Sequence, residues 1–208
     1  MKSLWKMFCL CLLLVVPCIV HAQTDAEDVD GTGASVAAAR QLGSRDPVER
    51  QRAAEELAAI GATNQRRLLE GYRLQEKNAR VRLALDWALY RTGKSAALFE
   101  LVRALDSSRA AQARAYLSTL DTPEPLYLFL ERANGLTQAE LLRVLAKVGD
   151  AGTLDRLKPY TESYDPKIAE AARLAVQEIE QRLSQQQQPN DTATRPRQVG
   201  TGEDSPPN

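Results

Sequence analysis

Cysteine and histidine are almost absent from this 208-residue chain, and those present are confined to its beginning. The three cysteines, Cys9, Cys11 and Cys18, and the single histidine, His21, all lie within the first 22 residues. The rest of the chain therefore has no disulfide, no thiolate nucleophile and no imidazole base. Zinc sites built from Cys and His are excluded there for the same reason.

The first 22 residues have the pattern of an export signal. Lys2 and Lys6 form a charged beginning, residues 8–20 are apolar, and small residues precede an expected cleavage after Ala22. This run is shorter than the roughly 20 residues that span a bilayer. We therefore expect no stable membrane span after removal of the signal, and a periplasmic or secreted protein. Lipid attachment at Cys18 is the alternative, but Val-Val-Pro precedes this cysteine where a lipoprotein signal has a small residue.

Neither sign of charge is in excess. The chain has 27 basic and 27 acidic residues, and loss of Lys2 and Lys6 with the signal leaves 25 against 27, a net charge near −2. A general polyanion binder shows a basic excess. The balance therefore predicts a partner other than nucleic acid.

Both ends of the expected mature chain lack an apolar pattern. Residues 23–34 are acidic, small and glycine-containing, and are predicted to form a flexible linker. Residues 184–208 are predicted to be a disordered tail rich in Gln and Pro. Between them, residues 35–183 carry the regular apolar spacing of α-helices.

A repeated helical pattern fills residues 35–183 and is clearest over residues 78–93. Five segments begin with a residue that can cap a helix, at steps of 32, 28, 28 and 31 residues: Asp46, Asn78, Asp106, Asn134 and Asp165. Most residues at positions 4, 8, 11, 12 and 15 of this template are apolar or small, which is the spacing of one helix face. Three of the helices are followed by a glycine that is expected in the left-handed conformation: Gly61, Gly93 and Gly149.

A second, less regular helix is predicted between successive template helices, so each unit is a helical hairpin of about 30 residues. One hairpin cannot cover its own apolar stripe. The units must therefore stack on one another into a solenoid.

Two segments resemble the second helix of HEAT repeats. They are DPVERQRAAEELAAIG at residues 46–61 and DPKIAEAARLAVQEI at residues 165–179. The resemblance covers roughly residues 44–183 and implies an all-α fold, a right-handed α-α superhelix of about five helical hairpins. Arg109 and Thr137 depart from the family pattern, which favours Val at these positions. HEAT repeats serve mostly as scaffolds and binding surfaces.

The resemblance also assigns a role to two arginines. Arg50 and Arg82 occupy template position 5, where HEAT-like repeats place an arginine that bonds an aspartate in an adjacent unit. We therefore expect a ladder of ion pairs between Asp46 or its equivalents and these arginines. Ligand binding by the arginines is the alternative.

The template also predicts which side chains face away from the core. Positions 3, 6, 10, 13 and 14 lie opposite the buried face, and in the HEAT arrangement this side lines the concave surface. Small residues of the third unit, such as Ala111 and Ser118, make a shallow depression there. We predict a protein or peptide site formed by Leu83, Trp87, Tyr90, Arg91, Arg143 and Lys147. The alternative is that Trp87 is buried and fills the space above the small third unit.

The expected function is that of an exported scaffold or interaction module that binds a protein or peptide, with no catalytic residue, cofactor or metal. One alternative is a structural subunit of a cell-envelope complex, assembled through the ends of the solenoid. Another is a hydrolase or lyase that uses only carboxylates, for which Asp86 near Glu100 is a candidate pair.

Overall fold

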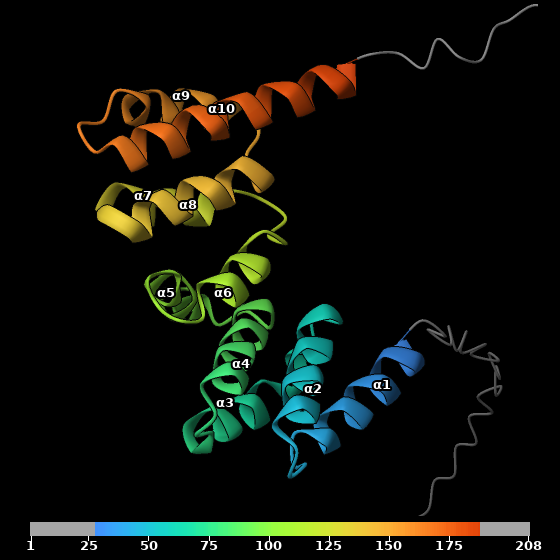
Figure 1. Ribbon diagram of the computed structural model, residues 1–208. Helices are drawn as coiled ribbons and strands as arrows, with labels where there is room; N and C mark the ends of the chain where they lie inside the picture. Colours follow the sequence, from blue (N-terminus) through green and yellow to red (C-terminus); the bar gives the residue numbers. More distant parts are fainter. Residues whose placement is uncertain (1–27, 188–208) are drawn as a thin grey trace, which may run out of the picture.

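The computed structural model describes residues 28–187, drawn in colour in Figure 1. All regular elements among these residues are helical, which confirms the predicted all-α class. The predicted signal segment, residues 1–22, lies outside the described residues, as does most of the predicted tail. No helix in the described part of the chain is both long and apolar enough to cross a membrane.

Ten α-helices and three short 3₁₀ helices follow one another along the described residues. The α-helices are α1 (Asp28–Gln41), α2 (Pro47–Ala59), α3 (Arg66–Gln75), α4 (Ala79–Arg91), α5 (Leu98–Arg103), α6 (Ala110–Leu117), α7 (Glu124–Arg132), α8 (Gly135–Val148), α9 (Ala151–Thr161) and α10 (Pro166–Gln187). The 3₁₀ helices are η1 (Thr63–Gln65), η2 (Ser95–Ala97) and η3 (Ala104–Asp106). Residues 28–34, expected to be a flexible linker, are helical, and α10 extends into the expected tail as far as Gln187.

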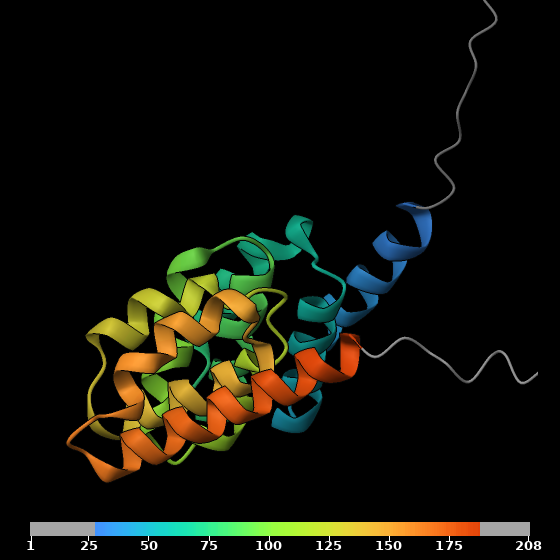
Figure 2. The same cartoon turned by 90° about the horizontal axis from the view of Figure 1, so that it is seen from above.

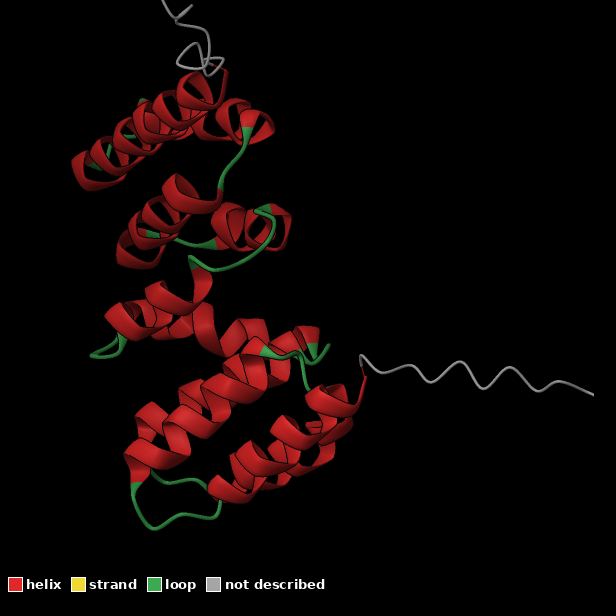
Figure 3. Cartoon of the chain, turned by 90° about the vertical axis from the view of Figure 1, so that its right-hand side faces the viewer, coloured by secondary structure: helices red, strands yellow, loops and turns green. Residues whose placement is uncertain are grey.

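The helices are stacked in chain order. Each even-numbered helix from α2 to α10 packs on the next one, and α3, α5, α7 and α9 pack on the even-numbered helix that follows each of them. Figures 1 and 3 show the resulting layers, with α9 and α10 at one end. At the other end α1 packs on α2, and Figure 2 shows it projecting away from the remaining helices.

The core follows the apolar template. Position 8 is fully buried in all five template segments: Ala53, Leu85, Ala113, Leu141 and Ala172. Each leucine removed from water in this way contributes about 1.5–3 kcal/mol to folding. Helix α4 is buried on nearly all sides, because α2, α3, α5 and α6 all pack against it.

Three of the predicted helix starts are capped by their own side chains, and at the last of them the Asp165 carboxylate accepts a hydrogen bond from the Lys167 N–H at 2.9 Å. The Asp46 carboxylate accepts a hydrogen bond from the Val48 N–H at 2.9 Å, and the Asn78 side chain accepts one from the Arg80 N–H at 2.9 Å. These bonds satisfy amides of the first turn that have no partner within the helix. Asn134 also precedes a helix, but its side chain makes no capping bond.

The three terminal glycines divide into two groups. Gly61 has a φ of 61° and Gly93 a φ of 95°, which confirms the left-handed prediction for both. Gly149 has a φ of −66°, so the prediction was wrong there. Its lack of a side chain is needed for close packing instead: an added Cβ would lie 2.5 Å from the Leu145 carbonyl oxygen and 2.7 Å from Ile179 Cδ1.

Candidate functional site

The third unit departs from the repeat. The template places a helix directly after Asp106, but α6 begins four residues later, at Ala110. Ser107 is extended, and its hydroxyl accepts a hydrogen bond from the Arg109 N–H at 3.1 Å and donates one to the Ala104 carbonyl at 2.6 Å. The prediction for Asp106 was wrong because the neighbouring serine supplies the local side-chain bonds that compete with helix formation.

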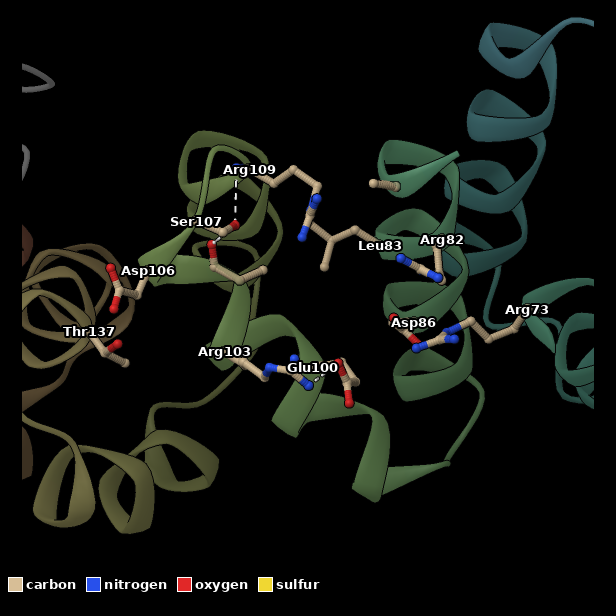
Figure 4. Close-up of a pocket in the computed structure, with 12 residues that line it drawn as sticks. Arg73, Arg82, Leu83, Asp86, Glu100, Arg103, Asp106, Ser107, Arg109 and Thr137 are labelled. Carbon is tan, nitrogen blue, oxygen red and sulfur yellow. Dashed lines mark hydrogen bonds and ion pairs between the residues drawn. The ribbon is translucent and has the colours of Figure 1, made fainter. Parts of the chain in front are cut away.

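The late start of α6 leaves a hollow of about 670 Å³ between α4, η3 and the beginning of α8 (Figure 4). Four arginines and three acidic residues line it, with a smaller apolar and hydroxyl-bearing share. We call it the arginine pocket, and its lining comprises Arg73, Ala79, Arg82, Leu83, Asp86, Glu100, Arg103, Ala104, Asp106, Ser107, Arg109 and Thr137.

The two candidate catalytic carboxylates both lie in the arginine pocket, but each has an arginine partner. Arg73 Nε lies 2.6 Å from Asp86 Oδ1, and Arg103 lies 3.7 Å from Glu100. Burial raises the pKa of Asp86, against the opposing effect of its bond to Arg73. Asp86 therefore has a structural role between α3 and α4.

The predicted arginine ladder is formed at one step and interrupted at the next. Arg50 donates two hydrogen bonds to the Glu76 carboxylate, at 2.8 and 3.0 Å, and this pairing raises the pKa of Arg50. The acid is thus a glutamate two residues before Asn78, not the predicted aspartate. By the same register Arg82 would meet Ala104, which has no charge, so the ladder has no acid at this step.

Arg82 and Asp106 form no ion pair with each other. Both line the arginine pocket, yet the Arg82 guanidinium and the Asp106 carboxylate each make no hydrogen bond or ion pair with any described residue. Arg109, which lines the same pocket, also makes no such bond through its guanidinium within residues 28–187. These three groups thus form no direct bond within the described residues, although the charge of Arg82 also acts on the Asp86 carboxyl and lowers its pKa.

Trp87, the expected anchor of the partner site, is 7% exposed. Its ring stacks on Tyr90 at 5.8 Å and on Tyr116 at 5.7 Å, measured between centroids, and the Arg91 guanidinium lies 5.5 Å from its centre. The structure thus brings Trp87, Tyr90 and Arg91 together as a packed cluster, in agreement with the alternative that Trp87 fills space. Leu83 is also buried, and it lines the arginine pocket.

Tyr116 completes this cluster and was not predicted. Its hydroxyl donates a hydrogen bond to Glu55 Oε1 at 2.5 Å and accepts one from Gln112 at 2.8 Å, which joins α6 to α2. Burial, together with the bond to Glu55, raises the pKa of Tyr116. The one sequence signal was a hydroxyl-bearing aromatic residue at template position 11, which is Ala88, Val144 and Ala175 in the second, fourth and fifth units and Glu56 in the first.

Arg143 and Lys147 lie apart from the Trp87 cluster. They line a separate hollow of about 220 Å³ on the face formed by α6, α8 and α10. We call this the basic hollow, and its lining comprises Arg114, Ser118, Arg143, Ala146, Lys147, Ala171, Leu174, Ala175 and Glu178. The predicted depression at the small residues of α6 is thus present at Ser118.

Two acidic residues hold the cations of the basic hollow in place. Glu140 is 7% exposed, and its carboxylate lies 2.5 Å from Arg143 and 2.9 Å from Arg114 Nε. The contact with Arg114 is an ion pair without the geometry of a hydrogen bond. Lys147 pairs with Glu178 at 2.8 Å. Three cations thus face two carboxylates, which leaves one positive charge in excess at the rim.

No group of three or more His, Cys, Asp or Glu side chains in the described part of the chain is arranged to hold a metal ion. No model of a known protein family matches the chain, and no curated protein matches it.

Proposed function

We propose that this protein is an exported, non-catalytic interaction module, built as a HEAT-like solenoid, that binds a protein or peptide partner on the face formed by α6, α8 and α10. The observation that carries the proposal is the basic hollow. It combines an apolar floor with a cationic rim, and it contains two of the residues predicted to bind a partner, Arg143 and Lys147.

The floor of the basic hollow accepts an apolar side chain. Three alanines and Leu174 form it, and Leu174 is 47% exposed although it is a large aliphatic residue. Covering this surface with an apolar side chain of the partner contributes about 25 cal/mol for each Å² of apolar area removed from water. The small alanines allow the partner backbone to approach the helices closely.

The rim of the hollow favours an acidic neighbour of that apolar side chain. Arg114 and Arg143 share the single carboxylate of Glu140, so their remaining N–H groups face solvent or a partner. A carboxylate of the partner would form charge-assisted hydrogen bonds there. The geometry therefore supports a partner segment in which a leucine-sized residue is flanked by Asp or Glu.

Selection from a random peptide display library, with the protein as bait, tests this specificity. The selected peptides are expected to share an apolar residue next to an acidic one. The variants Leu174→Asp and Arg143→Glu should each weaken binding of a selected peptide by tenfold or more, because each places a negative charge against the acidic segment. Fluorescence anisotropy of the labelled peptide measures the affinity.

Lys167→Glu on α10 is the matched control, because it makes the same charge change at an exposed residue outside the hollow. It should leave the affinity within about twofold. An equal loss of peptide affinity in Lys167→Glu and in Arg143→Glu would show that net charge alone governs binding. Full binding by Leu174→Asp would exclude the hollow.

If removal of α9 and α10 abolished a native assembly that both hollow variants preserve, assembly through the end of the stack would be the better proposal.

A further inference from the structure

Arg82 occupies the repeat position that carries an ion pair one unit earlier. In the first unit, Arg50 has this position and donates two hydrogen bonds to the Glu76 carboxylate, at 2.8 and 3.0 Å. It donates two more to the carbonyl oxygens of Ser44 and Arg45, at 2.9 and 3.0 Å. The Arg82 guanidinium makes no hydrogen bond or ion pair with any described residue, and it lines the arginine pocket (Figure 4).

The acid of this ion pair has no counterpart in the third unit. By the sequence template the residue equivalent to Glu76 is Ala104, and by backbone bonding it is Ser107. The Glu76 carboxylate accepts a hydrogen bond from the Asn78 N–H at 2.7 Å. The Ser107 hydroxyl accepts the corresponding bond from the Arg109 N–H at 3.1 Å. Ala104 and Ser107 both line the pocket, and neither can supply a carboxylate to Arg82.

A second arginine without a bonded partner lines the same pocket. Arg109 extends from the residues before α6 toward α4, the helix that carries Arg82 (Figure 4). Its guanidinium also makes no hydrogen bond or ion pair within residues 28–187. The other two arginines of the lining, Arg73 and Arg103, are each paired with a carboxylate. Arg82 and Arg109 are therefore the donors that a ligand can use.

The lining selects a ligand with one negative charge. A carboxylate matches the forked N–H donors of arginine, as in the ion pair of the first unit. A second negative charge would meet Asp86 and Glu100, so dianions are disfavoured. Ala79, Leu83 and Ala104 give the lining an apolar part that suits an aliphatic chain. The volume of about 670 Å³ is in the range of small-molecule sites.

We propose that the arginine pocket binds a small monocarboxylate, an organic acid with one carboxylate and a short aliphatic chain. Its carboxylate lies between Arg82 and Arg109 and takes the place of the acid that the ladder lacks at this step. Its aliphatic chain rests on Leu83 and Ala104. This site is separate from the basic hollow and does not depend on the function proposed for it.

A titration followed by the NMR signals of the arginine side chains tests the proposal. The probes are butyrate, butyramide, which has a similar size and no charge, and succinate, which carries a second carboxylate. We expect butyrate to bind with a dissociation constant on the order of 1 mM, and both other probes to bind about tenfold more weakly. Equal or tighter binding of butyramide or succinate would overturn the proposal, as would the absence of a saturable shift with butyrate.

A carboxylate added to the chain should compete with the ligand. Ser107→Glu places one at the position that Glu76 holds in the preceding unit, where it can pair with Arg82. The affinity for butyrate should then fall by about tenfold or more. Ser107→Gln is the matched control, because it adds a side chain of the same size without the charge, and it should leave butyrate binding unchanged. Equal butyrate affinity in the two variants would contradict the proposed position of the carboxylate.

Arg82→Gln tests the anchor of the ligand directly. It should remove the preference for butyrate over butyramide. Arg82 has no bonded partner to lose within the described residues, so the helical circular dichroism spectrum should be unchanged. Arg132→Gln on α7 is the control, since this exposed arginine lies outside the pocket, and it should retain the preference. Survival of the preference in Arg82→Gln would show that another residue holds the carboxylate.

Discussion

The start of α6 can be tested by removing single capping groups from two neighbouring units. The repeat pattern assigns the same role to Asn78 and Asp106, whereas in the structure Asn78 caps α4 and Ser107 supplies the side-chain bonds before α6. Three alanine variants therefore test whether the repeat pattern or the structure identifies the residue that matters at the start of α6: Asn78→Ala, Asp106→Ala and Ser107→Ala. The unfolding free energy of each is compared with that of the unchanged chain.

The expected magnitudes follow from the bonds that each variant removes. The Asn78 side chain accepts bonds from the Arg80 N–H at 2.9 Å and the Val81 N–H at 3.3 Å, and loss of such a cap costs about 1 kcal/mol. Ser107 makes two bonds of similar length, so Ser107→Ala should also cost about 1 kcal/mol. The Asp106 carboxylate makes none within the described residues, and Asp106→Ala should cost less than about 0.5 kcal/mol.

Urea unfolding followed by circular dichroism resolves these differences. With a slope of about 2 kcal/mol per molar urea, a loss of about 1 kcal/mol lowers the midpoint by about 0.5 M. The expected order is thus equal shifts for Asn78→Ala and Ser107→Ala and a much smaller shift for Asp106→Ala. A large shift for Asp106→Ala with none for Ser107→Ala would place the helix start at the repeat position. The arginine pocket would then lose its structural basis.

Two further predictions concern a tightly packed glycine and a buried acid. Gly149→Ala should destabilise the fold by about 1–3 kcal/mol in the same assay, because its Cβ would lie within 2.7 Å of both the Leu145 carbonyl and Ile179; a neutral result would show that α10 can move away freely. For Asp86, burial raises the folded-state pKa, so its contribution to stability is present at low pH and is lost as the pH rises through that value. The unfolding free energy of the unchanged chain should therefore rise relative to Asp86→Asn as the pH falls from about 7 to about 4, and a pH-independent difference would contradict this assignment.

The part of the fold that depends on periodic burial was predictable. The buried stripe at template position 8 and the capped starts of α2 and α4 follow from residue types at fixed spacing. These features are local, or they concern one face of one helix. The pairing of each template helix with a less regular neighbour was predictable for the same reason, since neither helix can cover its own apolar face.

The part that depends on competition between neighbouring groups was not predictable. Asp106 and Ser107 can each cap a helix, and only the packing of η3 decides between them. Trp87 occupies a template position that faces away from the core, but the third unit supplies Tyr116 to cover it. The arginine pocket follows from the first of these choices, so the composition of its lining could not be read from either unit alone.

The shortness of α5, η3 and α6 has a consequence for how the chain unfolds. These elements have six, three and eight residues, and they connect α4 to α8 by packing on both sides. In stacked helical units, each unit is stabilised mainly by contacts with its neighbours. We therefore expect the short elements between α4 and α8 to divide the stack into two units that unfold with separate free energies. Hydrogen exchange would then report two protection levels, one on each side of α6. A ligand that contacts both α4 and α8 would couple the two units, and hydrogen exchange would then report a single protection level.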